Sequence, residues 1–167
     1  MEYKFCPICK GDLEEKLHNL LVCKNCGYNF YQNPAPTCAL ILENSRGEIL
    51  LVKRKFEPKK GMLDLPGGFI EPNESIEEAT IREIKEELGI DVSEFKYLTS
   101  YPDDYLYDGV NLKILGITLT GKVDDNAIIA PSDDVEDAKF YKKEEIPLEE
   151  IAFENIEQAL IDYINKE

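Results

Sequence analysis

One stretch of this chain, Gly68 to Ile90, constrains its fold and chemistry more than any other. It begins with Gly68-Phe69-Ile70-Glu71-Pro72-Asn73-Glu74 and, seven residues later, ends with Arg82-Glu83-Ile84-Lys85-Glu86-Glu87-Leu88-Gly89-Ile90. Ser75 followed by Glu78 forms a capping-box pattern, and no Pro or Gly interrupts the run before Gly89, which can end a helix in the left-handed conformation. The stretch therefore predicts a loop followed by a helix that ends just before Gly89.

Three glutamates, Glu83, Glu86 and Glu87, crowd onto one side of this predicted helix. At about 100° per residue they fall within an arc of about 100°. The adjoining apolar stripe consists of Ile81, Ile84 and Leu88. Like charges three and four residues apart repel each other, so a positive group is expected among them. Mg²⁺ or Mn²⁺, which prefer oxygen ligands, suit three carboxylates better than zinc does. The simpler alternative is a solvated acidic face, because glutamate is frequent throughout the chain.

The whole pattern, G-x5-E-x7-R-E-U-x-E-E-x-G-U with U a bulky aliphatic residue, resembles the Nudix box. This box is the signature of hydrolases that cleave a nucleoside diphosphate linked to another group. The resemblance implies four ligands for the catalytic metals, namely the carbonyl of Gly68 and the carboxylates of Glu83, Glu86 and Glu87. It implies that Glu74 and Arg82 hold the loop and the helix together. It also implies a further acidic residue before a late strand, for which Asp134 is the candidate.

Two C-x2-C pairs lie near the start of the chain. The pairs are Cys6 with Cys9 and Cys23 with Cys26, separated by thirteen residues and each followed closely by a glycine. Four thiolates at this spacing predict a structural zinc ribbon, since a fully ligated tetrahedral zinc has no open position for chemistry. A redox-active pair and two disulfides are the alternatives. His18 is a spare candidate ligand, but four cysteines already suffice.

Composition limits the function classes. The chain of 167 residues carries 19 basic and 34 acidic residues, a formal net charge of −15. Such a charge repels nucleic-acid backbones, so we expect no general DNA or RNA binding, by the ribbon or otherwise, whereas a small anionic substrate is compatible with bound metals. No long apolar run and no leader pattern predicts a membrane segment, so a cytoplasmic location is expected.

The remaining segments predict a sheet with a second helix. The apolar runs 37–42 and 49–52 read as a hairpin of buried strands, with Cys38 a small core residue. Arg54 follows the second run and is a candidate contact for substrate phosphates. Tyr101 and Tyr105 flank what reads as a loop and are candidates to stack on a base. Residues 124–135 read as a loop, 138–141 as a strand, and 153–164 as an amphipathic helix.

Together these features predict an α/β fold: a Nudix α/β/α sandwich with a mixed, largely antiparallel sheet over residues 34–167, after a zinc ribbon over residues 1–33. The resemblance extends to the ribbon-bearing subgroup that includes NADH pyrophosphatases and ADP-ribose or FAD diphosphatases. The motif S-Q-P-W-P-F-P-x-S that accompanies NADH in that subgroup is absent. The expected function is Mg²⁺- or Mn²⁺-dependent hydrolysis of a pyrophosphate bond in such a dinucleotide, releasing a nucleoside monophosphate. A non-catalytic nucleotide sensor on the same fold is the alternative, and a homodimer fits the family.

Overall fold

The central strands are continuous apolar runs, and their successive residues point to opposite faces of one sheet and build a core on each face. The computed structural model describes residues 3–107 and 109–166. Strands β4 (Ala35–Glu43) and β5 (Ile49–Arg54) pair antiparallel, as the predicted hairpin requires. Leu40 and Leu42 point to one face and Ala39 and Ile41 to the other. Such period-two burial on both faces is expected for a strand covered by helices on each side.

The sheet is mixed and mostly antiparallel. The strand order is β10-β5-β4-β9-β8, with β6 (Leu63–Asp64) beside β5 and β7 (Gly67–Phe69) beside β4. Strands β8 (Phe95–Tyr107), β9 (Val110–Lys122) and β10 (Val135–Tyr141) complete it. Among the paired strands of this sheet, within the described residues, β4 and β9 are the one parallel pair. The predicted loop over residues 124–135 is found over residues 124–134, and the strand predicted over 138–141 begins earlier, at Val135.

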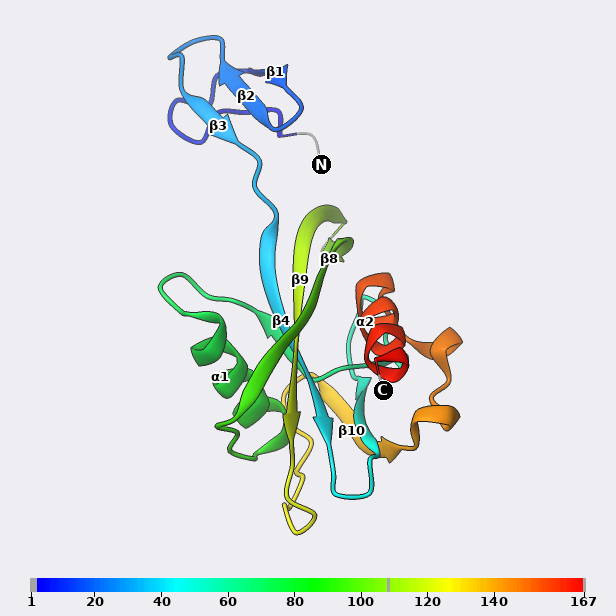
Figure 1. Cartoon of the computed structure of the whole chain (residues 1–167). Helices are drawn as coiled ribbons and strands as arrows, with labels where there is room; N and C mark the ends of the chain where they lie inside the picture. The colour runs from blue at the N-terminus through cyan, green and yellow to red at the C-terminus, as the bar shows by residue number, and fades with distance from the viewer. Residues whose placement is uncertain (1–2, 108, 167) are drawn as a thin grey trace.

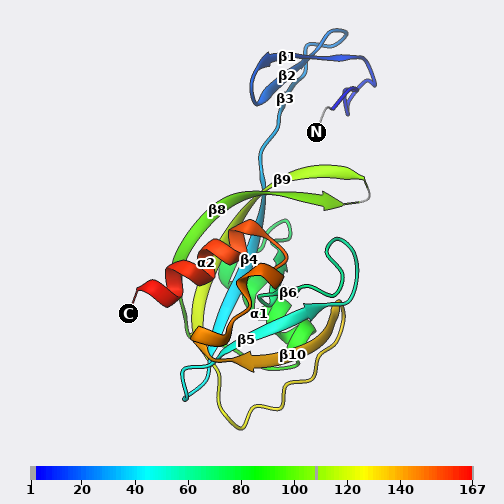
Figure 2. The same ribbon diagram turned by 90° about the vertical axis from the view of Figure 1, so that its right-hand side faces the viewer.

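Two helices cover the two faces of the sheet (Figure 1, Figure 2). Helix α1 (Ile76–Leu88) packs Ile84 and Leu88 into one core, whereas α2 (Glu154–Asn165) packs Ile156 and Leu160 into the other. Two short 3-10 turns, η1 (Lys143–Glu145) and η2 (Leu148–Glu150), lead into α2. The predicted α/β/α sandwich is confirmed.

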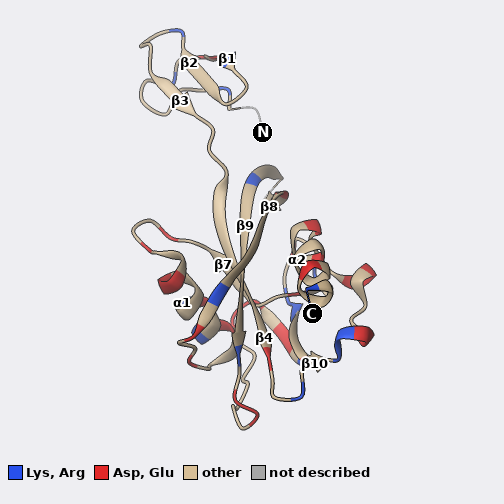
Figure 3. Cartoon of the chain, in the orientation of Figure 1, with Lys and Arg blue, Asp and Glu red and all other residues tan. Residues whose placement is uncertain are grey.

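The cysteine pairs lie in a separate small sheet of β1 (Leu13–Leu17), β2 (Leu20–Cys23) and β3 (Asn29–Tyr31). An extended segment joins this unit to β4, so it stands apart from the sandwich (Figure 1). Acidic residues are spread over α1, α2 and the loops around them (Figure 3). No helix in the described part of the chain is long and apolar enough to span a membrane.

One local prediction about the sandwich is wrong. The segment between Tyr101 and Tyr105 was expected to be a loop, but it lies inside the continuous strand β8. Pro102 is tolerated there because β8 is an edge strand, paired only with β9, and an edge position can lack one ladder hydrogen bond.

Candidate active site

Helix α1 begins and ends as its sequence predicts. The Ser75 hydroxyl accepts from the Glu78 N–H at 3.2 Å, and the Glu78 carboxylate accepts from the Ser75 N–H at 2.8 Å. Gly89 ends the helix with φ of 71° and donates its N–H to the Lys85 carbonyl. Ile81, expected in the apolar stripe, is instead 42% exposed, because it lies beyond the edge of the contact between helix and sheet. The helix is thereby fixed with its glutamates along the β7 loop.

The three glutamates of α1 differ in burial. Glu87 is only 4% exposed, and its carboxylate accepts the Gly67 N–H at 2.9 Å. The side chain of Glu83 is 14% exposed, whereas that of Glu86 is 49% exposed. Glu83 and Glu87 therefore face the sheet, and Glu86 lies at the rim of the site.

Arg82 supplies the positive charge that the glutamates require on one side. Its Nη1 contacts Glu83 Oε1 at 2.7 Å and Glu86 Oε2 at 3.2 Å. Its Nε and Nη2 donate to the two Glu74 oxygens at 2.7 and 2.9 Å, and Nη2 also donates to the Phe69 carbonyl at 3.1 Å. Such a two-point arginine–carboxylate contact fixes geometry as well as charge. Glu74 and Arg82 thus tie the loop to the helix.

This clamp should make the protein sensitive to acid. Arg82 holds the pKa of Glu74 at about 2, below its ordinary 4.5. A carboxyl with a lowered folded-state pKa stabilises the fold above its unfolded pKa and loses that contribution as the pH falls toward 2. We expect Glu74→Gln to remove this part of the decline in the free energy of unfolding between about pH 5 and about pH 2. Urea unfolding at several pH values measures it. The exposed Glu77→Gln on the same helix is the control, and equal slopes for wild type and Glu74→Gln would contradict the assignment.

Two glycines bring the β7 backbone against its neighbours. A Cβ on Gly67, whose φ is 144°, would lie 2.2 Å from the Cys38 carbonyl oxygen of β4. A Cβ on Gly68 would lie 2.6 Å from Glu83 Oε1. Any side chain at either position would push the strand or the carboxylate away. The glycine pair therefore allows the predicted ligand Gly68 to lie beside Glu83.

Asp134, which lies just before β10, is close to Glu87. Burial raises the pKa of Glu87 well above its ordinary value, and the nearby Asp134 carboxylate raises it further. Burial also raises the pKa of Glu83, while its bond to Arg82 opposes the rise. Within residues 3–107 and 109–166, neither Glu87 nor Asp134 forms an ion pair. The structure thus leaves an uncompensated acidic pair beside Glu83.

This donor set fits a hard divalent cation. Oxygen ligands from Glu83, Glu87 and Asp134 are those that Mg²⁺ and Mn²⁺ prefer, and a cation offsets both the burial and the repulsion that raise the pKa of Glu87. The oxygens are not drawn into a closed cage, since the cysteines form the only tight ligand cluster among the described residues. Arg82 contacts Oε1 of Glu83 and the Gly67 N–H contacts Oε2 of Glu87, so the other oxygen of each carboxylate is the one available to an ion.

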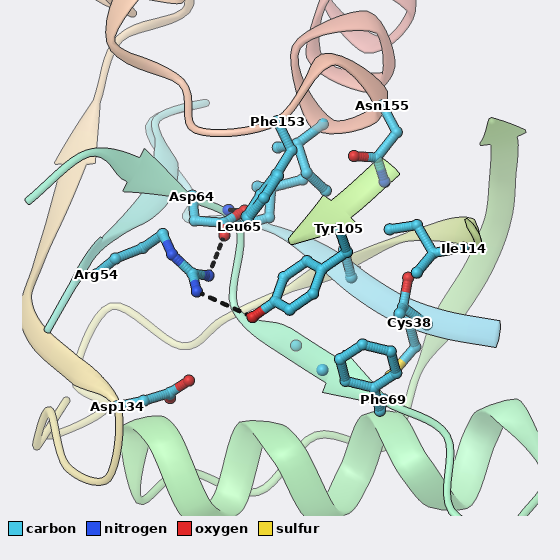
Figure 4. A pocket seen from close by; sticks show the side chains of 15 residues that line it. Cys38, Arg54, Asp64, Leu65, Phe69, Tyr105, Ile114, Asp134, Phe153 and Asn155 are labelled. Carbon is cyan, nitrogen blue, oxygen red and sulfur yellow. Dashed lines mark hydrogen bonds and ion pairs between the residues drawn. The ribbon is translucent and has the colours of Figure 1, made fainter. Parts of the chain in front are cut away.

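A cleft opens next to this acidic group, between β4, β7 and the start of α2. Arg54, at the end of β5, lies along its wall. Arg54 Nη1 pairs with Asp64 at 2.8 Å, and Nη2 donates to the Tyr105 hydroxyl at 3.3 Å (Figure 4). Asp134 also lines the cleft. The predicted residues Arg54, Tyr105 and Asp134 are therefore brought together, although they come from three separate strands or loops.

Two aromatic residues of the cleft wall, Phe69 and Phe153, were missed in the sequence. Tyr105 lies 5.4 Å from Phe69 and 5.3 Å from Phe153 between ring centroids, and Arg54 lies 5.0 Å from the Phe153 ring centre. Asn155 also lines the cleft, and its Oδ1 is the one buried side-chain oxygen or nitrogen without a partner in the described residues. Phe153 was assigned to the apolar helix stripe, and no short-range signal marked it as part of a cleft.

Tyr101 does not join this cleft. Its hydroxyl donates to Asp162 on α2 at 2.7 Å, four residues along β8 from Tyr105. Because an extended strand rises about 3.3 Å per residue, Tyr101 lies too far along β8 to reach the cleft. Tyr101 therefore anchors α2 to the sheet.

The four cysteines of the N-terminal unit converge. All four sulfurs lie within 4.8 Å of one another, with Cys6–Cys26 at 3.8 Å and Cys9–Cys23 at 3.4 Å. Four sulfurs at about 2.3 Å from a tetrahedral zinc are about 3.8 Å apart. In the first turn the residue in the left-handed conformation is Lys10 and not Gly11. A side chain at Gly11 would collide with Asn25, because an added Cβ would lie 2.7 Å from the Asn25 Cβ. The cluster fits a metal, whereas His18 is exposed and stands outside it.

The chain belongs to the NUDIX domain family, which matches residues 33–161. It is 34% identical over 140 residues to the ADP-ribose pyrophosphatase of Methanocaldococcus jannaschii, covering 82% of this chain and 77% of that protein. It is 32% identical over 161 residues to an NAD-capped RNA hydrolase of Schizosaccharomyces pombe, covering 86% of this chain but only 41% of that protein. The predicted class, a Nudix pyrophosphohydrolase, is confirmed by these relatives.

A solved structure shares nearly the whole fold. A NUDIX hydrolase from Nitrosomonas europaea superposes with a TM-score of 0.73 at 25% identity, covering 98% of this chain and 92% of that one. The predicted α/β/α architecture is therefore that of a known Nudix hydrolase.

Proposed function

We propose that this chain hydrolyses the pyrophosphate bond of ADP-ribose, releasing AMP and ribose 5-phosphate. The observation that carries this choice is the match to the archaeal ADP-ribose pyrophosphatase, of which the chain covers 77%. The missing tryptophan-containing motif argues against NADH as the best substrate, and FAD is a further candidate. The net charge of −15 favours a small dinucleotide over the body of an RNA.

The catalytic group in this proposal comprises Glu83, Glu87 and Asp134, with Glu86 at the rim and Gly68 beside Glu83. A divalent cation held there would neutralise the phosphates and activate water. In the reaction, the oxygen of water forms a bond to one phosphorus, and the bond from that phosphorus to the bridging oxygen breaks. A carboxylate of this group takes the proton that water loses.

The cleft provides for the two other parts of such a substrate. Arg54 Nη2 faces the cleft close to the acidic group, which suits an oxygen of the diphosphate. The rings of Tyr105, Phe69 and Phe153 supply an apolar wall for a base or ribose. The cleft encloses about 570 Å³, a volume that includes open solvent at its mouth.

A substrate panel tests the proposal. With Mg²⁺, we expect AMP to be released fastest from ADP-ribose and more slowly from FAD, NADH and diadenosine polyphosphates. Chelation with EDTA should stop release, and re-addition of Mg²⁺ should restore it. Tight binding of ADP-ribose without any turnover would instead support the nucleotide-sensor alternative.

The N-terminal unit is proposed to be a structural zinc ribbon that ends near residue 33. Four cysteine ligands leave zinc no open position, so the ion would support the fold and take no part in hydrolysis.

A further inference from the structure

Asp64 is a buried carboxylate at the cleft that no part of the proposed reaction uses. It is 6% exposed and lies on β6, next to the acidic group. Its Oδ2 accepts from Arg54 Nη1 at 2.8 Å, and its Oδ1 accepts from the Leu65 N–H at 2.9 Å. Both oxygens are therefore engaged, one of them by the only arginine that lines the cleft.

Arg54 is held at a second point as well. Its Nε donates to the Pro58 carbonyl at 2.9 Å, so that only Nη2 is left facing the cleft and Tyr105. The fork of a guanidinium fits a carboxylate closely, and this one is 15% exposed. The hydrogen bonds from Nε to Pro58 and from Nη1 to Asp64 fix the orientation of the guanidinium group.

This direction matters because other carboxylates are close by. A small cavity is lined by Arg54, Asp64, Glu87 and Asp134 together. Arg54 pairs with Asp64 and with neither Glu87 nor Asp134, although these two carry no other ion pair in the described chain. Figure 4 shows the dashed contact from Arg54 to Asp64 and the Asp134 carboxylate on the other side of the guanidinium. An arginine released here would find Asp134 or Glu87 as its next partner.

We propose that Asp64 is a positioning residue that holds Arg54 away from Glu87 and Asp134, so that these carboxylates stay available to a divalent cation. The inference rests on the proposed function, because it assigns the cation to that same site. It explains why a carboxylate is kept buried beside an already acidic site. A divalent cation and the Arg54 guanidinium would compete for the carboxylate oxygens of Glu87 and Asp134. By pairing with Arg54, Asp64 leaves these oxygens to the cation.

The substitution Asp64→Asn tests this cleanly. Asparagine has the same shape but only one acceptor oxygen, so it cannot serve both the Leu65 N–H and Arg54. We expect Mn²⁺ affinity, measured without substrate by electron paramagnetic resonance, to fall by about tenfold or more, as for other outer-shell partners of metal ligands. The double variant Arg54→Ala with Asp64→Asn should regain wild-type affinity, because the competing cation is gone. Asp91→Asn, which removes the partner of Lys85 elsewhere on the surface, is the control.

The outcomes separate this inference from the proposed function. Unchanged Mn²⁺ affinity in folded Asp64→Asn, or no recovery in the double variant, overturns the inference even if ADP-ribose is hydrolysed. A loss that the double variant reverses supports it even if the substrate proves to be another dinucleotide. Should Asp64→Asn fail to fold, the Nε–H signal of Arg54 in wild-type protein decides by NMR. The chemical shift of this signal and its slow hydrogen exchange with solvent should be unchanged when Mg²⁺ saturates the protein. Disappearance of the signal would refute a fixed Arg54 guanidinium.

Discussion

Glu87→Gln should abolish metal-dependent hydrolysis while leaving the fold at least as stable as the wild type. The Glu87 carboxylate is 4% exposed and lies beside Asp134. Its negative charge is needed to bind a cation, but without a cation that buried charge destabilises the fold. Loss of an outer-shell partner alone costs about 10- to 100-fold, so loss of a ligand should lower kcat/KM by at least about 100-fold. Glu83→Gln should behave similarly.

The stability half of this prediction follows from the sign of the pKa shift. Burial raises the folded-state pKa of Glu87 above 4.5, so its contribution favours folding at acid pH and is lost as the pH rises through the folded pKa. Gln carries no charge, and its amide oxygen still accepts the Gly67 N–H. The free energy of unfolding at neutral pH should therefore stay equal or rise.

Steady-state kinetics and urea unfolding of the same samples measure both halves. The control is Glu77→Gln, an exposed glutamate in the first turn of α1, which should keep wild-type turnover. A Glu87→Gln protein that is inactive only because it is unfolded would not support the assignment. A folded variant with wild-type turnover would remove Glu87 from the site.

The second large effect is expected at the cysteine cluster. Cys23→Ser should release the bound zinc and unfold residues 3–31, while the sandwich from β4 to α2 stays folded. In the described part of this unit only Cys6, Leu21 and Cys23 are buried, so two of its three buried residues are proposed metal ligands. A unit of this size without a core depends on its metal for folding.

Elemental analysis and two-dimensional NMR test this prediction. Wild-type protein should carry about one zinc per chain, and Cys23→Ser should carry none and lose the dispersed signals of the ribbon. His18→Ala, which changes an exposed residue outside the cluster, should keep its zinc. Retention of full zinc by Cys23→Ser, or a zinc-free wild type with dispersed ribbon signals, would contradict a metal-dependent unit.

What the sequence could predict depends on how local each interaction is. The capping box of α1, its end at Gly89 and the four-cysteine cluster are set by residues close together in the chain, and each was predicted correctly. The two-faced burial of β4 and β5 follows from their continuous apolar runs. These features need no knowledge of the tertiary fold.

The cleft could be predicted only in part, because it is assembled by tertiary contacts. Phe153 and Asn155 belong to it only because the start of α2 lies against β8, and Asp64 enters it through an ion pair across β5 and β6. Tyr101 and Tyr105 look alike in sequence, but their positions along β8 place one at α2 and the other in the cleft. Likewise, the positive group expected among the glutamates is partly Arg82, which the sequence assigned to holding the loop.

The most direct test of the account is to locate the metal. Anomalous X-ray diffraction from crystals soaked in Mn²⁺ and a non-hydrolysable ADP-ribose analogue would show where the ion binds. We predict manganese between Glu83, Glu87 and Asp134, close to the Gly68 carbonyl, with the diphosphate between the metal and Arg54. Manganese bound elsewhere, with these carboxylates still held by Arg82 and the Gly67 N–H, would contradict the account.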